Sequence, residues 1–197
     1  MKKSQTNNIK DKKGFSILET IIAAFVLSIG ILTVVGLISS SLKNSMDSRN
    51  QIIASELVQE GIELARNVRD GNFITGSSDS FTGFPASNLA DCRVSKLDFS
   101  PKIDCGSGDK RMIYANGYYI HNGQDSSGTS TQFFRRITFQ YFKSDGSAAA
   151  NPTDPATVSA TITSMVSWNG SIPSTNTALC NAARKCVYTQ LVLTKWK

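Results

Sequence analysis

The longest apolar run of the chain lies near its amino terminus. No charged residue occurs between Thr20 and Leu42, and the eighteen residues from Ile21 to Ile38 are mostly Ile, Leu, Val, Ala and Phe. Eighteen residues form about 27 Å of helix at about 1.5 Å per residue, and the apolar flanks add to that length. The pattern therefore predicts a helix that spans a bilayer.

Beyond Ile38 the apolar positions become one-sided, which is typical of an amphipathic helix. The stripe consists of Leu42, Met46, Ile53, Leu57, Leu64 and Val68 at spacings of four and seven, broadened by Val58, Ile62 and Ala65. Charged residues lie off the stripe at Arg49, Glu56, Glu60, Glu63 and Arg66. We expect one helix from Phe15 to Arg69 that ends at Asp70-Gly71, where glycine is a common terminator.

After Gly71 the pattern alternates and predicts β-strands. The expected strands cover residues 111–115, 118–121, 133–142, 158–168 and 187–196, and Asn116-Gly117 is a strong hairpin signal. Segments 75–95, 125–131 and 145–157 are rich in Gly, Ser, Asp and Pro, which indicates surface loops. The predicted fold is α+β, with an antiparallel sheet packed on the stripe from Leu42 to Val68.

Seven aromatic residues are expected to be core and cross-strand partners and not a ligand cage. They are Tyr118, Tyr119, Phe133, Phe134, Phe139, Tyr141 and Phe142.

The composition narrows the class of protein. Of 197 residues, 40% are hydrophobic and 18% are charged, which excludes a disordered chain and a multidomain enzyme. The formal charge is +6, but residues 1–14 hold five lysines and one acid and so contribute +4 of it. This basic segment precedes the apolar run, which predicts that the amino terminus stays in the cytoplasm while the rest is exported.

An ordinary cleaved secretory signal has a shorter apolar region of about 7–15 residues and an A-x-A-like site, and neither is present here. A simple signal anchor is the alternative. An anchor leaves Glu19 unexplained, because a carboxylate beside an apolar span is costly and is usually functional.

The sequence Lys12-Lys13-Gly14-Phe15-Ser16-Ile17-Leu18-Glu19 resembles the processing site of type IV prepilins and pseudopilins. The resemblance implies that a prepilin peptidase cuts between Gly14 and Phe15 and methylates the new amine of Phe15. It also implies other pilin or pseudopilin subunits and an assembly platform protein as partners. A chance match ahead of a simple anchor is the alternative. Glycine suits the cut because it fits a restricted backbone close to catalytic groups.

Cleavage would leave an ammonium at Phe15, about 6 Å along a helix from Glu19. The resemblance implies that Glu19 pairs with the Phe15 amine of a neighbouring subunit, which would set the register between apolar helices. The alternative role is to neutralise the subunit's own terminal charge and helix dipole.

The segment Gln59–Asp70 looks like that of PilV-type minor pilins. Many major pilins carry a proline near Gly36, where this chain has glycine. These features favour a minor pilin of a type IV pilus, whose head contacts other subunits or surfaces. A pseudopilin of a type II secretion or DNA-uptake system is the second hypothesis, and the leader fits both.

The resulting domain plan has four parts. A leader, residues 1–14, would be removed, residues 15–38 would cross the cytoplasmic membrane or enter a filament core, residues 39–70 would form the amphipathic half, and residues 71–197 would form an extracytoplasmic β-rich head.

Four cysteines in an exported domain favour two disulfides, for which three connectivities exist. We favour the local pairs Cys92–Cys105 and Cys180–Cys186, and a disulfide near the carboxyl end also fits the resemblance. A zinc site is the rival, but the chain has one histidine and no C-x-x-C.

We expect neither an enzyme nor a cofactor. The one histidine, His121, is predicted to be a surface residue at a strand end, and phosphate-binding glycine motifs and EF-hand spacing are missing from the sequence. Arg184-Lys185 and Lys195-Trp196-Lys197 could form a small DNA-binding patch. The net charge of +2 on residues 15–197 favours solvated lysines instead.

Overall fold

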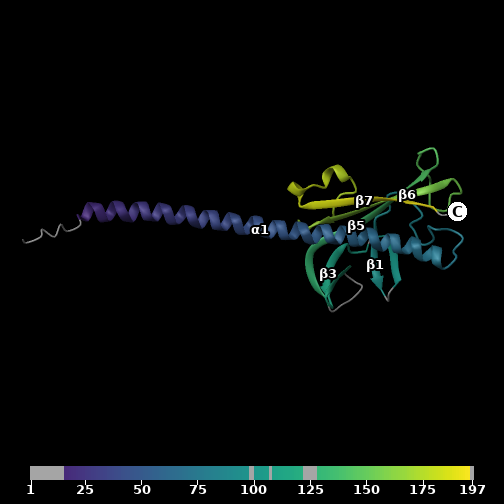
Figure 1. Ribbon diagram of the computed structural model, residues 1–197, viewed down its shortest axis with the longest axis horizontal. Helices are drawn as coiled ribbons and strands as arrows, with labels where there is room; N and C mark the ends of the chain where they lie inside the picture. Colours follow the sequence, from purple (N-terminus) through teal and green to yellow (C-terminus); the bar gives the residue numbers. More distant parts are fainter. Residues whose placement is uncertain (1–15, 98–99, 107, 122–127, 196–197) are drawn as a thin grey trace, which may run out of the picture. The chain divides into compact units, whose positions relative to one another are not determined.

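The computed structural model describes residues 16–97, 100–106, 108–121 and 128–195. A single helix, α1 (Ile17–Ile74, 58 residues), contributes to two compact units, which divide between Met46 and Asp47. The second unit contains the sheet, and we call it the head (Figure 1).

Helix α1 ends three residues beyond Gly71, so the predicted end was wrong. The terminator is Gly76, whose φ of 69° places it in the left-handed region. Its N–H donates to the Phe73 carbonyl at 3.2 Å, and the Ser77 N–H donates to the Asn72 carbonyl at 2.9 Å. These two bonds form a Schellman motif, which satisfies the last carbonyls of the helix.

Seven strands of the described chain form one antiparallel sheet, and two short 3-10 helices lie between the last two strands. They are β1 (Cys92–Leu97), β2 (Ser100–Cys105), β3 (Arg111–Ala115), β4 (Tyr118–His121), β5 (Thr129–Lys143), β6 (Thr157–Ser167), η1 (Thr177–Leu179), η2 (Ala182–Arg184) and β7 (Cys186–Thr194). Strand β5 is central: β6 pairs along one edge, while β3 and then β1 pair along the other. The predicted α+β architecture, with a long amino-terminal helix on an antiparallel sheet, is confirmed.

Strands β3 and β4 have the bounds that the sequence predicted. Both turn residues have positive φ, 52° at Asn116 and 91° at Gly117, as a type I′ turn requires. Hairpin β1–β2 was not predicted, and four of the six residues of β1 fall in the expected loop 75–95. Pro101 reads as a strand breaker, but β2 is an edge strand, where proline is tolerated.

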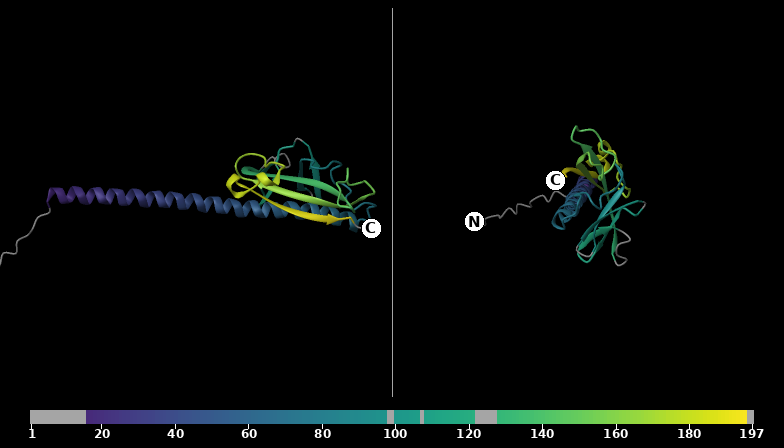
Figure 2. Two further views of the ribbon diagram at one scale, coloured as in Figure 1. Left: turned by 90° about the horizontal axis from the view of Figure 1, so that it is seen from above. Right: turned by 90° about the vertical axis from the view of Figure 1, so that its right-hand side faces the viewer.

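The head core lies between one face of α1 and the sheet (Figure 2). The buried helix residues are Ala54, Leu57, Val58, Gly61, Ile62, Leu64 and Ala65. Leu42 and Met46, which were expected to continue this stripe under the sheet, are 62% and 67% exposed. The buried stripe is therefore shorter than predicted and lies wholly within the head.

Aromatic residues fill the part of the core near the carboxyl end of α1. Phe81 and Phe84 come from the predicted surface loop yet are buried, so that expectation was wrong for them. Their rings lie 5.1 Å apart, and Phe84 lies 5.2 Å from Phe139. The buried Tyr141 hydroxyl donates to the Pro85 carbonyl at 2.7 Å, and burial raises the pKa of this phenol.

The other aromatic residues that were expected in the core differ in their exposure. Phe133, Phe134 and Phe139 are buried as expected, whereas Tyr118 is 53% exposed.

Candidate functional site

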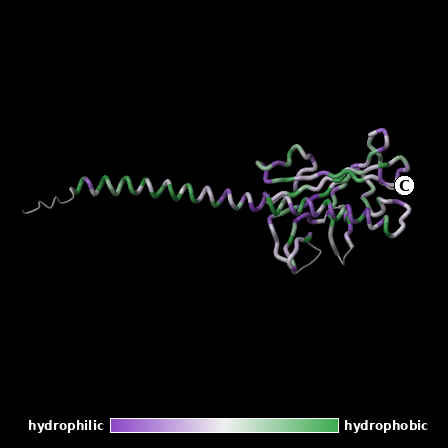
Figure 3. The backbone as a smooth tube through the Cα atoms, viewed as in Figure 1, coloured by the Kyte–Doolittle hydropathy of each residue, from purple (hydrophilic) through white to green (hydrophobic). Residues whose placement is uncertain are grey.

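The amino-terminal half of α1 is an exposed apolar surface. Its most apolar 18-residue window has a mean hydropathy of 2.8 and contains no buried residue. Leu18, Phe25 and Leu32 are each about two-thirds exposed or more, at 66%, 66% and 72%. Apolar residues dominate this part of the chain in Figure 3, whereas the head is mixed. Among the described residues, α1 is the one helix that is both long enough and apolar enough to cross a membrane.

Four hydroxyl groups in this segment bond within the helix. The four bonds run from Thr20 to the Ser16 carbonyl (3.3 Å), Ser28 to Ala24 (2.7 Å), Thr33 to Gly30 (2.8 Å) and Ser39 to Val35 (2.9 Å). Such bonds satisfy side-chain donors that hydrocarbon cannot. The polar residues of the span are thus compatible with lipid.

Glu19 lies in the first turn of α1, and it is the one charged residue of the sequence between Ser16 and Leu42. A carboxylate is favourable there because the helix dipole is positive at its amino end. The other residues of the expected processing site, Lys12, Lys13, Gly14 and Phe15, lie outside the described residues. The structure therefore places Glu19 and leaves the expected cleavage and methylation site as predictions.

Comparisons with family models, curated proteins and solved structures found no match. The functional interpretation therefore depends on the chain's own residues.

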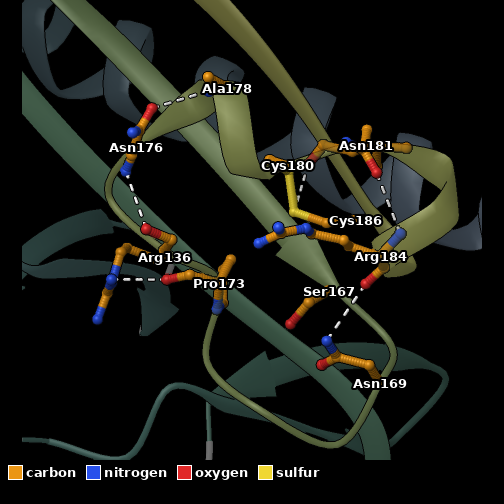
Figure 4. Close-up of a disulfide and its surroundings, with 12 residues drawn as sticks. Arg136, Ser167, Asn169, Pro173, Asn176, Ala178, Cys180, Asn181, Arg184 and Cys186 are labelled. Carbon is orange, nitrogen blue, oxygen red and sulfur yellow. Dashed lines mark hydrogen bonds between the residues drawn. A yellow bond between two sulfur atoms is a disulfide. The ribbon is translucent and has the colours of Figure 1, made fainter.

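Both disulfides of the head are the local pairs. Cys92 and Cys105 lie directly opposite each other in hairpin β1–β2, 13 residues apart in sequence. Cys180 and Cys186 are 6 residues apart and enclose η2 (Figure 4). Within the described part of the chain, all cysteines are disulfide-bonded and no three His, Cys, Asp or Glu residues could hold a metal ion.

The structure separates the basic residues that could have formed a DNA-binding patch. Arg184 and Lys185 precede β7 and Lys195 follows it, so nine strand residues, about 30 Å, lie between them. Lys185 pairs with Asp47 at 3.2 Å, and Lys195 pairs with Asp79 at 2.8 Å. Trp196 and Lys197 lie outside the described residues. The described lysines thus serve the head's own ion pairs, and a single patch is not formed by them.

His121 is fully buried, so the prediction of a surface histidine was wrong. It lies opposite Met112 in the β3–β4 pairing, and Met112 is a core residue. Burial, with the positive charges of Arg135, Arg93 and Lys110, lowers the pKa of His121 to about 2. This imidazole is therefore neutral at physiological pH and has no access to a substrate.

The buried cation Arg135 was not predicted at all. Its Nη1 donates to Glu60 Oε2 at 2.7 Å and to the Leu57 carbonyl at 3.3 Å, and its Nη2 donates to the Val94 carbonyl at 2.9 Å. Burial lowers the pKa of Arg135, and the Glu60 charge opposes that shift. One side chain on β5 thus connects α1 and β1.

The next residue of β5, Arg136, belongs to a second ion-paired cluster. Arg136 pairs with Asp91 through two bonds of 3.0 Å, and Lys110, 1% exposed, donates to the Gly106 carbonyl at 2.9 Å. The Arg136 guanidinium also donates to the Pro173 carbonyl at 2.6 Å, which fixes the loop before η1 (Figure 4). These contacts organise the head.

Proposed function

We propose that this chain is a prepilin, processed by a prepilin peptidase and assembled through its amino-terminal helix as a minor subunit of a type IV pilus. The observation that carries the proposal is a basic Gly14-Phe15 junction followed by Glu19 and an uncharged span. The exposed helix surface and the internally bonded hydroxyls support it, because such a helix requires lipid or other apolar helices around it.

In the proposed mechanism the precursor is held in the cytoplasmic membrane with its leader in the cytoplasm. Cleavage after Gly14 frees the Phe15 amine, which is then methylated. The Glu19 carboxylate of an incoming subunit pairs with the Phe15 amine of a subunit already in the filament. In surroundings of low dielectric an unpaired charge is costly, so this pair selects one register between helices that are otherwise uniformly apolar.

The α+β head, with a short buried stripe on α1, supports the same proposal. Its sheet covers α1 from Ala54 onwards, while residues 17–46 remain exposed. This division gives one part of the helix to the head and another to apolar partners. A pseudopilin of a secretion or DNA-uptake system would use the same chemistry. The likeness of Gln59–Asp70 to PilV-type minor pilins favours the pilus.

The test is the amino terminus of the mature protein. Full-length chain co-expressed with an active prepilin peptidase should lose residues 1–14 and gain one methyl group on Phe15, as read by intact-mass and terminal-peptide spectrometry. Gly14→Val should block both changes, and Ser16→Ala should leave both intact. A mature protein that begins at Met1 contradicts the proposal and leaves a simple anchored surface protein.

Processing alone does not separate a pilus from a pseudopilus. Deletion of the gene in its native host should reduce piliation while secretion and DNA uptake remain normal. Loss of secretion or uptake with normal piliation would instead favour the pseudopilin.

A further inference from the structure

One end of the head gathers exposed aromatic and basic side chains. Strand register defines this end: Tyr114 pairs with Thr129, the first residue of β5, and Ser167, the last residue of β6, pairs with Cys186, the first residue of β7. The β3–β4 turn and the Cys180–Cys186 loop therefore lie at the same end of the sheet (Figure 1). We call this end the base of the head.

The entry of α1 into the head is also at the base. Asp47, the first residue of the head, pairs with Lys185 in the disulfide loop at 3.2 Å. Ala54 and Leu57 then join Phe133 and Trp168 in one core cluster, which lies near the start of β5 and the end of β6. The chain therefore enters the head between the hairpin β3–β4 and the disulfide loop.

The hairpin supplies the aromatic part of the base. Tyr114 is 48% exposed and Tyr118 is 53% exposed, although both lie next to a well-packed core. The Tyr114 ring contacts the Tyr119 ring edge-on at 5.2 Å, and Tyr119 contacts Phe133 in the same way at 6.0 Å. The Tyr114 ring is thus connected to the core through Tyr119 and Phe133. Tyrosine is enriched where one end of a side chain is apolar and the other is wet, as at a membrane interface.

The disulfide loop supplies a basic part. Arg184 is exposed, and the Asn169 side chain donates to its carbonyl at 3.2 Å, while the Asn181 side chain accepts from its N–H at 3.1 Å (Figure 4). Leu179, one residue before the disulfide, is 39% exposed. Arg49 adds a second exposed cation on α1.

The strand order gives the base its width. Strands β4 and β7 lie four positions apart in the order β4-β3-β5-β6-β7, which is about 19 Å at about 4.8 Å per strand. The tyrosines and Arg184 are therefore at opposite sides of the helix entry. Two separated contacts resist rotation of a body about a single tether better than one contact does.

Covalent continuity keeps this surface close to the membrane. Asp47 is nine residues from Ile38, the last residue of the expected membrane span, and nine residues reach about 32 Å even when fully extended. A bilayer that holds residues 17–38 is therefore present near the base at a high effective concentration, which a second molecule in solution is not.

We propose that the base of the head, formed by Arg49, Tyr114, Tyr118, Leu179 and Arg184, docks on the anionic phospholipid headgroups of the membrane that α1 crosses. The tyrosines enter the interfacial layer, and the two arginines bind lipid phosphates. This proposal rests on insertion of the apolar helix half and is independent of cleavage at Gly14 and of filament assembly.

The test uses the full-length chain in vesicles whose headgroups carry a nitroxide quencher. Tyr118→Trp places a reporter at the base, and Val192→Trp places a control reporter at a residue 60% exposed and about 20 Å further along β7. The fluorescence of the unsubstituted chain, which contains Trp168 and Trp196, is subtracted. Vesicles contain either phosphatidylglycerol with phosphatidylcholine or phosphatidylcholine alone, and flotation shows insertion of the chain.

We expect quenching of the Tyr118→Trp reporter in the anionic vesicles, less quenching in phosphatidylcholine, and none at Val192→Trp in either. Adding Arg184→Gln should lower the ratio of docked to undocked protein about five-fold, since one cation near an anionic surface contributes about that factor. The matched control is Lys102→Gln, an exposed lysine on β2, which should leave the ratio unchanged.

Three results would overturn the proposal. They are equal quenching of the two reporters, no quenching of Tyr118→Trp in a chain that floats with the vesicles, or equal quenching of Tyr118→Trp in vesicles with and without phosphatidylglycerol. A spectral shift that appears in detergent and grows with protein concentration would instead assign the base to a second copy of the chain. Each outcome leaves the amino-terminal processing test unaffected, because the assay uses uncleaved protein.

Discussion

The Arg135 guanidinium lies 2.7 Å from the Glu60 carboxylate, and 75 residues separate the two in sequence. Arg135 is 1% exposed at its side chain, whereas Glu60 is 39% exposed. The same guanidinium reaches the Leu57 carbonyl on α1 and the Val94 carbonyl on β1. It therefore fixes which face of α1 packs on the sheet and the position of α1 along its own axis.

Replacing Glu60 with Gln should destabilise the head by about 1–3 kcal/mol, because it removes the partner of a buried charge. The exposure of Glu60 keeps the effect below that of a fully enclosed pair. Urea unfolding of the full chain in detergent measures it. Glu63→Gln, which removes a surface partner of Arg66, should cost less than about 1 kcal/mol. Equal effects of the two substitutions would show that the pair is not structurally important.

Gly61 and Gly71 form a matched pair on the same helix. A Cβ at Gly61 would lie 2.6 Å from the Ser164 hydroxyl and 3.1 Å from Ile137 Cδ1, whereas a Cβ at Gly71 meets nothing within 4 Å. Gly61→Ala should therefore destabilise the head by about 1–3 kcal/mol through overpacking. Gly71→Ala should stabilise it by about 0.5–1 kcal/mol through helix propensity. Thermal unfolding of both variants checks the opposite signs, and a neutral Gly61→Ala would contradict the close approach of helix and sheet.

The lowered pKa of the buried His121 predicts that the head loses stability in mild acid. Its pKa is about 2 in the folded head, against 6.5 for an unperturbed histidine, so between these values the unfolded chain binds a proton that the folded chain does not. Acidification through this window therefore favours unfolding, by up to about 1.4 kcal/mol per pH unit. The contribution is complete above pH 6.5 and is lost as the pH falls.

Denaturant unfolding between pH 6.5 and 4.5 measures this slope above the range in which most carboxylates titrate. His121→Gln keeps a polar side chain without a titrating group and should flatten the slope. The same slope in both proteins would assign it to other residues.

Glu19→Ala should leave a chain that is folded, cleaved and membrane-bound but poorly incorporated into filaments, because the proposed partner of the Phe15 amine is missing. Quantitative blotting of sheared filaments against total membrane protein gives the incorporated fraction. Thr20→Ala, which removes a hydroxyl bonded within the helix, should assemble normally. Normal incorporation of Glu19→Ala would mean that the carboxylate serves its own helix terminus instead.

Patterns that depend on local chemistry were predictable from the sequence. The turn Asn116-Gly117 specifies its hairpin because both residues adopt positive φ. The alternating sequence pattern located β5 and β6, although burial in these strands does not alternate strictly. The apolar span needs no tertiary context, since length and composition alone define it. Local spacing also favoured the two disulfide pairs that the head contains.

Features that depend on long-range partners were not predictable. Arg135 reads as a surface charge until Glu60 and two carbonyls surround it, and His121 reads as a strand end until Met112 and its neighbours enclose it. The helix end was misplaced because Gly71 and Gly76 look alike in sequence, and the bonds from Gly76 and Ser77 decide between them. A signal for the helix–sheet contact was present: Gly61, a glycine within an amphipathic helix, can mark a close approach.

Four hydroxyls of the apolar segment have acceptors within the helix itself and keep them in any surroundings. Moving this segment from hydrocarbon to a site among protein helices would exchange one set of van der Waals neighbours for another and break none of those bonds. Glu19, the one charged residue of the sequence between Ser16 and Leu42, would change its electrostatic environment on such a transfer. Extraction from a bilayer would then be opposed chiefly by lost apolar contact, which an apolar neighbour restores in full.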